Sequence, residues 1–154
     1  MRCTAVKTDF DNQFFFVVYA SSRAEEMAAW GWSQEEQQKF LHMQYQCQQR
    51  SYQMQYSHLE SSLITSDDQP AGRLITAKTE AGIVLVDISI LPEFRNHGLG
   101  SSLILTLQSE TPASESLRLS VLKSNPALRL YKRLGFQVHE ENEMYFTMKW
   151  ENPG

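Results

Sequence analysis

The amino-acid sequence predicts a mixed α/β fold, and three observations support this class. Between residues 83 and 136, short runs rich in β-branched residues alternate with segments of helical periodicity. Residues 20–56 are instead rich in Gln, Tyr, Trp and Met and carry a helix start signal. The chain has 154 residues and no Gly/Ser-rich or Pro-rich linker, so we expect one domain over residues 1–154.

The first expected elements are a strand and a helix. Cys3–Lys7 has the composition of a short strand. Phe14–Tyr19 has strand propensity on its own, but residues 23–29 continue it with good helix formers, so local propensity and context conflict. We predict a helix here, because three residues that could cap its N-terminus precede it: Thr8, Asp9 and Asp11.

A second helix is expected from Ser33 to about Tyr52. Ser33 and Glu36 form a capping box of the S-x-x-E type. Two neighbouring stripes follow at helical spacing, which either pack in the core or place Gln and Tyr side chains along a ligand cleft. One stripe is Phe40, Met43, Cys47 and Met54, and the other is Leu41, Tyr45, Tyr52 and Tyr56.

The rest of the chain predicts a series of strands with two more helices. Turn residues separate the first three strands at 67–70 and 80–82. The expected strands are 63–65, 72–78, 83–90, 117–122, 136–139 and 144–149, and the expected helices are 98–108 and 126–134.

The charge and cysteine content exclude several classes of partner. The formal net charge is −4, whereas binding of nucleic acid or an anionic membrane is driven by clustered Lys and Arg. We therefore expect neither partner, and the acidic surplus, which lies mostly in residues 1–80, weakly favours a cationic acceptor. The chain has two cysteines, Cys3 and Cys47, and we expect two free thiols in a reducing cytoplasm over a single disulfide. The apolar run 14–20 is far shorter than a membrane span of about 20 residues. We expect a cytoplasmic protein.

The most informative segment is the one from Asp87 to Leu103. An apolar strand stops at Pro92, a turn with Gly98 follows, and a helix begins. This order directs several backbone N–H groups and the positive end of the helix at one point, which predicts an anion site for a phosphate or pyrophosphate. There is no Gly-Lys-Ser/Thr sequence, and two glycines do not satisfy the dinucleotide-binding fingerprint.

Two motifs in this half of the chain resemble those of the GNAT superfamily of N-acetyltransferases. Arg95-Asn96-His97-Gly98-Leu99-Gly100 is similar to its pyrophosphate signature, Q/R-x-x-G-x-G/A. The second motif is strand 119–121 followed by the helix of 124–136, which ends in Leu-Gly-Phe with Gly135 at its C-cap. The resemblance covers residues 60–150 strongly and the first sixty residues only in element order.

The resemblance implies a central sheet of six to seven strands, mostly antiparallel, splayed between strands 4 and 5 and flanked by about four helices. It implies acetyl-CoA as co-substrate and no metal. The pantetheine arm would bind backbone groups of Ile88, Ser89 and Ile90. Asn125 would contact it as well, although many relatives place this Asn seven residues before the Tyr, where Ser124 stands here. The pyrophosphate would bind amides of Arg95, Asn96, His97, Gly98, Leu99, Gly100 and Ser101.

The chemistry implied is direct attack of an amine on the thioester. An alkyl amine with a pKa of about 10.4 is mostly protonated at pH 7, so the site needs a proton acceptor and an acid for the departing thiolate. The resemblance implies Tyr131 as this acid and a cofactor contact, against the alternative of a Tyr that only packs on the sheet. Asp87 is the best candidate for the base, because a carboxylate between Val86 and Ile88 is unusual in a buried strand; a hydrogen-bonded structural role is the alternative.

We therefore predict an N-acetyltransferase that acts on a primary amine of a small molecule or peptide. The alternative is a non-catalytic module of the same fold that binds or senses acyl-CoA, and a longer acyl chain stays open. In this family the first two helices wall the acceptor cleft, so Trp30, Trp32 and helix 33–56 would hold a cation by cation–π contact. Small members often form homodimers, which leaves a homodimer open.

Overall fold

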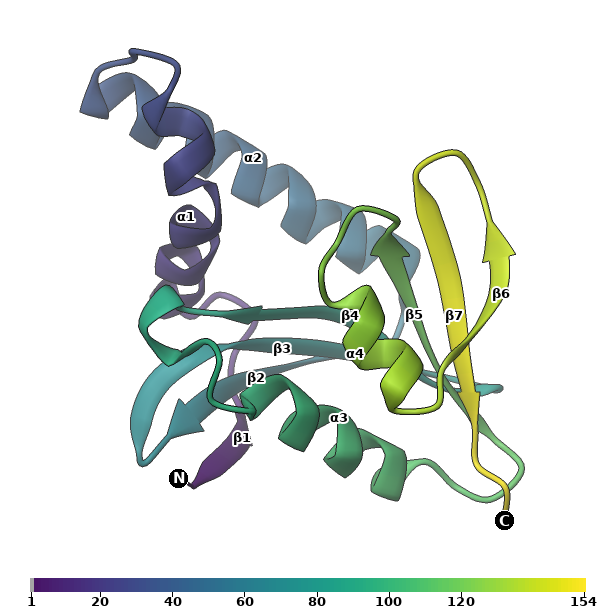
Figure 1. Cartoon of the computed structure of the whole chain (residues 1–154). Helices are drawn as coiled ribbons and strands as arrows, with labels where there is room; N and C mark the ends of the chain where they lie inside the picture. Colours follow the sequence, from purple (N-terminus) through teal and green to yellow (C-terminus); the bar gives the residue numbers. More distant parts are fainter. Residues whose placement is uncertain (1) are drawn as a thin grey trace.

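The computed structural model describes residues 2–154, and its centre is a seven-stranded sheet in the order β1-β2-β3-β4-β5-β7-β6 (Figure 1). Strands β4 and β5 pair in parallel and every other neighbouring pair is antiparallel, which confirms the predicted mostly antiparallel, mixed sheet. The strands are β1 (Cys3–Lys7), β2 (Leu59–Ser66), β3 (Gln69–Thr79), β4 (Gly82–Ile90), β5 (Ser116–Leu122), β6 (Gln137–Glu141) and β7 (Tyr145–Glu151).

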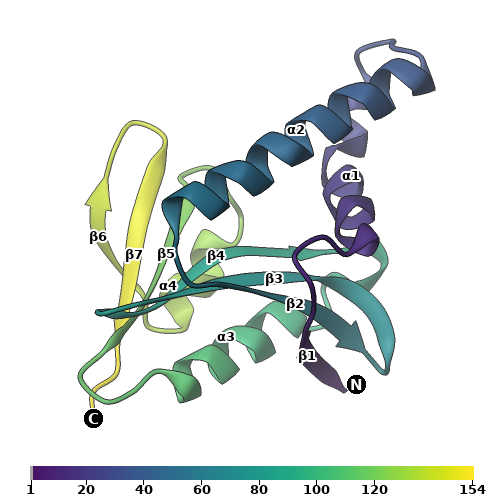
Figure 2. The same cartoon turned by 180° about the vertical axis from the view of Figure 1, so that it is seen from behind.

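Helices cover both faces of the sheet (Figures 1 and 2). The α-helices are α1 (Gln13–Ala28), α2 (Gln34–Gln55), α3 (Leu99–Glu110) and α4 (Leu128–Arg133), and a short 3-10 turn, η1, spans Pro92–Phe94. Helices α1 and α2 form a hairpin over one face, while α3 and α4 lie together on the other. The Gln108 side chain of α3 links the latter two by donating to the Leu134 carbonyl at 2.9 Å.

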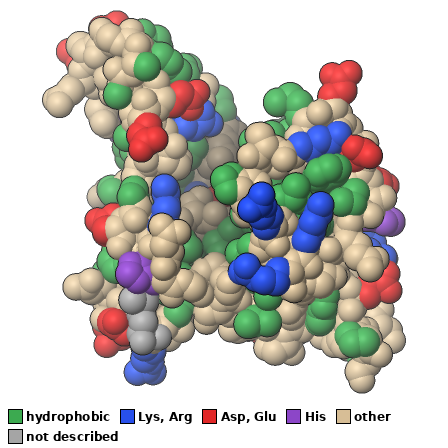
Figure 3. Space-filling model, in the orientation of Figure 1, with side chains coloured by type: hydrophobic (Ala, Val, Ile, Leu, Met, Phe, Trp, Pro, Cys, Tyr) green, Lys and Arg blue, Asp and Glu red, His purple; other side chains and the backbone are tan. Residues whose placement is uncertain are grey.

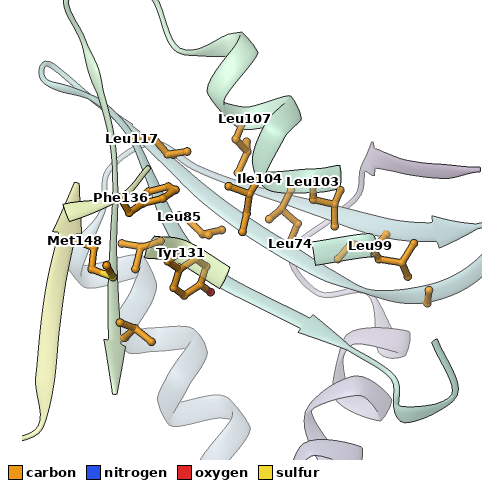
Figure 4. Close-up of a cluster of buried hydrophobic side chains, with 14 residues drawn as sticks. Leu74, Leu85, Leu99, Leu103, Ile104, Leu107, Leu117, Tyr131, Phe136 and Met148 are labelled. Atoms are coloured by element: carbon orange, nitrogen blue, oxygen red, sulfur yellow. The ribbon is translucent and has the colours of Figure 1, made fainter. Parts of the chain in front are cut away.

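The main core lies between the sheet and the pair α3 and α4. Leu103, Ile104 and Leu107 of α3 pack against sheet residues such as Leu117 and Met148, which are completely buried (Figure 4). Burial of apolar surface at about 25 cal/mol per Å² makes this cluster the main source of stability. A smaller cluster of Tyr19, Met27 and Leu41 joins α1 to α2.

Helix α1 confirms the prediction that Phe14–Tyr19 is helical. Its apolar residues recur at helical spacing, so Phe15 and Val18 are both buried against the sheet. This burial outweighs the strand propensity of the aromatic run, because tertiary packing routinely overrides a local preference of a few tenths of a kcal/mol. The predicted caps were wrong: Asn12 is the N-cap, and its side chain accepts from the Phe14 N–H at 2.9 Å.

Helix α2 has the predicted capping box, with reciprocal bonds between Ser33 and Glu36. Its two stripes behave differently. The stripe that contains Leu41 and Tyr45 faces α1 and the sheet, whereas Met54 on the other stripe is 88% exposed. The stripe that contains Met54 therefore packs inward at Phe40, which contacts the same cluster as Leu41, and is exposed farther along the helix.

Several element boundaries differ from the sequence-based expectation. Strand β2 begins at Leu59 rather than residue 63, because its polar first half pairs with β3 through backbone bonds that composition does not reveal. Gln69 and Pro70 already belong to β3, since Asp67 and Asp68, both at positive φ, complete the turn alone. Helix α4 is shorter than predicted and begins only at Leu128.

Candidate active site

Strands β4 and β5 separate halfway along their length, and this opening defines the candidate site. Their parallel pairing runs from Gly82 with Ser116 to Leu85 with Leu119 and ends there. Residues 87–90 of β4 pair with β3 but not with β5. On the β5 side these residues have no strand partner, so their backbone groups, apart from the Ile90 carbonyl that accepts from Arg95, can bind an extended ligand as an added strand would.

A β-bulge in β4 marks the point at which the strands part. Opposite β3, Thr76 pairs with Leu85 and Ile75 with Asp87, so Val86 is the extra residue. A bulge bends its strand and changes which face the following side chains occupy. After it, Asp87 and Ser89 point to the face covered by α1 and α2, while Ile88 and Ile90 pack with the core on the α3 face.

The loop between β4 and α3 ends in a helix N-terminus with free donors. Gly98 is the N-cap at φ +76°, and no side chain caps the helix. The first intrahelical bond runs from the Ser102 N–H to the Gly98 carbonyl. Within residues 2–154, none of the backbone N–H groups of residues 96–101 donates to the protein. This is the arrangement that binds anions at helix N-termini.

A cleft of about 800 Å³ runs from this loop to α4. Figure 3 shows it as a hollow between the α1/α2 side of the molecule and the α4 side, with Lys and Arg side chains gathered on the α4 side. Arg133 of α4 lines it, as does Arg95, whose Nε donates to the Ile90 carbonyl at 2.9 Å. Every residue that the sequence assigned to acetyl-CoA binding lines this cleft except His97, which is exposed beside it.

Tyr131 joins the core to the cleft. Only 7% of its surface is exposed, and its ring packs edge-on against Phe136 with ring centroids 5.9 Å apart. Figure 4 shows its hydroxyl turned away from Phe136 and Leu117. Burial, with a further contribution from the charge of Asp87, raises the pKa of Tyr131, so the phenol stays protonated and able to donate.

Asn125 lies at the turn that leads into α4. Its side-chain oxygen accepts from the Ala127 N–H at 2.9 Å, which leaves the amide NH₂ group as the donor toward the cleft. Ser124 is exposed and lies outside the residues that line the cleft.

Asp87 lies at the rim of a second, smaller cavity of about 170 Å³ beneath α1 and α2. The Ser89 hydroxyl donates to its Oδ2 at 3.1 Å. Burial raises the pKa of the Asp87 carboxyl, while the Ser89 bond, the Arg73 charge and the Ile88 N–H oppose that rise. A raised pKa makes the Asp87 carboxylate a stronger proton acceptor than an exposed aspartate.

The sequence analysis missed Arg73, which lies directly opposite Ser89 on β3 and is only 2% exposed. The available signal was a charge within the apolar run Ala71–Ile75, the same signal that identified Asp87. Trp30 and Trp32 are the converse case. They contact each other and meet Phe40 edge-on at the tip of the α1–α2 hairpin, and they line neither the cleft nor the smaller cavity, so the structure does not bring them to the candidate site.

Comparisons with known proteins agree with this geometry. Residues 28–148 match the family model of the acetyltransferase (GNAT) domain. The PaiA N-acetyltransferase of Thermoplasma acidophilum, solved with coenzyme A, is 16% identical with a TM-score of 0.68, over 98% of this chain and 99% of that one. An acetyltransferase of Thermus thermophilus is 13% identical with a TM-score of 0.69, over 97% of each chain. No curated protein sequence matches the chain.

The chain therefore belongs to the GNAT acetyltransferase family and is an acetyl-CoA-dependent acyltransferase. A further structure with this fold is the Campylobacter jejuni N-acetyltransferase PseH in complex with acetyl coenzyme A, 16% identical with a TM-score of 0.60, over 97% of this chain and 99% of that one. Over residues 2–154, no helix is both long and apolar enough to cross a membrane.

Proposed function

We propose that the protein transfers the acetyl group of acetyl-CoA to a primary amine of a small molecule or peptide, by direct attack of the amine. The observation that carries this proposal is the combination of the free β4 edge, the free N–H groups at α3 and Tyr131 around one cleft. Membership of the GNAT family supports the acyl transfer, and the geometry supports the assignment of residues.

The cleft fits the co-substrate. The N–H groups of residues 96–101 and the start of α3 would hold the pyrophosphate, with Arg95 and Arg133 as nearby cations. Gly100 leaves this approach open, because a Cβ there would meet only the Leu130 side chain, at 3.7 Å. The free edge of Ile88–Ile90 and the amide of Asn125 would hold the pantetheine arm.

Acetyl-CoA supplies the acetyl group as a thioester: the amine nitrogen bonds to its carbonyl carbon and the C–S bond breaks. Asp87 would accept the proton that the amine loses, directly or through a water molecule. Tyr131 would donate its hydroxyl proton to the departing sulfur and then be reprotonated. Its raised pKa keeps that proton in place until it is needed.

An acetylation assay over a panel of primary amines, read as free thiol released from acetyl-CoA, tests this function. The panel contains amino acids, polyamines, aminoglycosides and short peptides with a free N-terminus. We expect thiol release that depends on one class of amine. Tight acetyl-CoA binding with no amine-dependent thiol release from any class would contradict the proposed function.

A further inference from the structure

The starting observation is a buried guanidinium that has no hydrogen-bond partner. Arg73 is 2% exposed, and neither its Nε nor its Nη2 makes a hydrogen bond in the part of the chain that the structure describes. No carboxylate lies within 4.0 Å of it among the ion pairs of the described residues. Because arginine stays charged in proteins, donors left unsatisfied in this way are costly, and a partner for them is expected.

Aromatic rings hold the Arg73 side chain in place. Its Cζ lies 4.8 Å from the ring centroids of both Phe10 and Phe15 and 5.7 Å from that of Tyr45. Contacts with ring faces stabilise the positive charge without using its N–H donors. The hydroxyl of Tyr45 is also buried and has no hydrogen-bond partner among the described residues. The guanidinium is therefore positioned, and its donors stay available.

Arg73 is one of the residues that line the small cavity beneath α1 and α2. Asp87 and Ser89 of β4 also line it on the sheet side, and Tyr19 of α1 and Gln48 of α2 line it on the helix side. Arg23 of α1 lines it as well, and its charge is paired with Glu26 at 3.6 Å. Val18, Ser22 and Ser89 line both this cavity and the larger acetyl-CoA cleft, so the two adjoin. A molecule in the small cavity would thus lie next to the end of the cleft that Tyr131 lines.

The cavity presents a fixed positive and a fixed negative group side by side. Arg73 pairs with Ser89 across the β3–β4 ladder, and Asp87 is two residues from Ser89 on the same face. Side chains in such a diagonal relation lie about 7–8 Å apart at most, measured between Cβ atoms. Arg73 and Asp87 form no ion pair within 4.0 Å among the described residues, which leaves room for a ligand that carries both charges.

We propose that the small cavity binds the acceptor and that Arg73 binds a carboxylate of that acceptor, while Asp87 faces its amino group. The acceptor is then a small amine with a carboxylate close to the amine, that is, an amino acid. This inference rests on the proposed function, and it adds the class of the acceptor. It also agrees with the net charge of −4, because a zwitterion adds no net negative charge to an acidic surface.

A carboxylate fits this cavity better than other charged groups. The planar fork of arginine donates two parallel hydrogen bonds to a carboxylate. A phosphate dianion would be repelled by Asp87, and a purely cationic amine would leave Arg73 unpartnered and repel it. A cavity of about 170 Å³ favours a single small molecule over a folded protein substrate.

The test compares three acceptors that differ only in the carboxylate: an amino acid, its primary amide, and the amine that lacks the carboxyl group. For the wild type we expect kcat/KM to be about 10- to 100-fold higher for the amino acid, the range for hydrogen bonds to charged groups. Arg73→Met should remove this preference by raising KM for the amino acid alone. Arg50→Met, an exposed arginine outside both cavities, makes the same change in net charge and should leave the preference intact.

Two outcomes would overturn the inference: equal rates for the three acceptors in the wild type, or a preference that survives Arg73→Met. Arg73→Lys keeps the positive charge but loses the two parallel N–H donors of the guanidinium, so it should keep only part of the preference for the amino acid. This variant tests the inference if Arg73→Met does not fold. A purely structural Arg73 predicts equal losses for all three acceptors and a lower melting temperature.

A binding measurement separates this inference from the proposed function. Calorimetry without acetyl-CoA should show that the amino acid binds to the wild type and not to Arg73→Met. Amino-acid binding that depends on Arg73, with no thiol release from acetyl-CoA, would contradict the proposed function and leave the inference standing. The inference alone would be contradicted if amines release thiol from acetyl-CoA, but the enzyme shows no preference for a carboxylate and does not bind the amino acid.

Discussion

The ring of Tyr131 packs in the core, and Tyr131 also lines the cleft. Removal of the hydroxyl oxygen alone therefore separates its role in packing from its proposed role as an acid. Tyr131→Phe keeps the edge-on contact with Phe136 and removes only the proton donor. Because general acids contribute about 10²- to 10⁴-fold, we expect kcat to fall about 10²-fold. The dissociation constant of acetyl-CoA should stay within about twofold, since binding groups are elsewhere in the cleft. Steady-state kinetics and calorimetry measure the two quantities.

The melting temperature serves as the control for this substitution. It should be unchanged or slightly higher in Tyr131→Phe, because the variant keeps the buried ring. An unaltered kcat would mean that Tyr131 only packs against the sheet and that another group protonates the sulfur.

The raised pKa of Asp87 predicts how kcat depends on pH. Burial raises its pKa above the ordinary aspartate value of about 3.9, so the carboxylate that accepts a proton is present only above this raised pKa. The kcat should therefore rise with pH through the Asp87 pKa and then level off. Loss of activity on the alkaline side should begin only above about pH 10, since the pKa of Tyr131 is raised as well.

The variant Asp87→Asn checks this assignment, because the amide keeps the shape of the side chain and cannot take up a proton. We expect a lower kcat and the disappearance of the acidic limb from the pH profile of kcat. If the limb persists at the same pH in Asp87→Asn, it belongs to another group and Asp87 has only the structural role of accepting from Ser89.

At the scale of elements, the loop before α3 can be tested against a matched glycine. Gly98 and Gly31 have nearly the same positive φ, +76° and +70°, and a Cβ at either would meet nothing within 4 Å. Valine at either position is strained by about 1–3 kcal/mol, so both variants should melt at a lower temperature. Only Gly98→Val should also weaken acetyl-CoA binding, because Gly31 lies at the tip of the α1–α2 hairpin, outside the cleft.

The measurement is the rise in melting temperature that acetyl-CoA produces in each variant, since a ligand that binds only the native state raises it. Gly31→Val should show the wild-type rise and Gly98→Val little or none. An equal rise in the two variants would contradict a pyrophosphate site at this loop.

The sequence predicted best those elements whose signals are local. The capping box of α2 and the loop around Gly98 depend on residues next to each other in the chain, and the structure contains both. Helix α1 could be predicted only by weighing context against propensity. None of its three predicted caps, Thr8, Asp9 and Asp11, is the N-cap, because Asp and Asn are both good caps and only the three-dimensional path selects Asn12.

The features that the sequence could not predict are those that arise between strands. The bulge at Val86 and the end of the β4–β5 pairing depend on the register with β3 and β5, which no local pattern encodes. For the same reason Arg73 and Asp87 could each be noticed as a charge in an apolar strand, but their placement around one cavity required the ladder. The two motifs predicted residues that line the larger cleft, and the small cavity emerged only from the fold.

At the scale of the whole molecule, the net charge of −4 opposes the binding of a nucleotide that carries several phosphates. Helix α4 offsets this locally, because its short span contains Arg129, Lys132 and Arg133, of which Arg133 lines the cleft. Exposed charges farther apart than a Debye length of about 8 Å are largely screened at physiological salt. Binding of acetyl-CoA should therefore depend on where a positive charge is placed, and much less on the total charge.

Two substitutions with the same effect on net charge test this argument. Arg133→Ala removes a cation from the cleft, whereas Lys39→Ala removes one that pairs with Glu35 on α2, outside the cleft. We expect Arg133→Ala to raise the dissociation constant of acetyl-CoA a few-fold, about 0.5–1 kcal/mol, and to reduce its dependence on salt. Lys39→Ala should match the wild type at physiological salt. Calorimetry at low and high salt measures the dissociation constant of acetyl-CoA for each variant and its dependence on salt. Equal effects of the two variants would show that the total charge of the molecule, not the position of Arg133 on α4, governs binding.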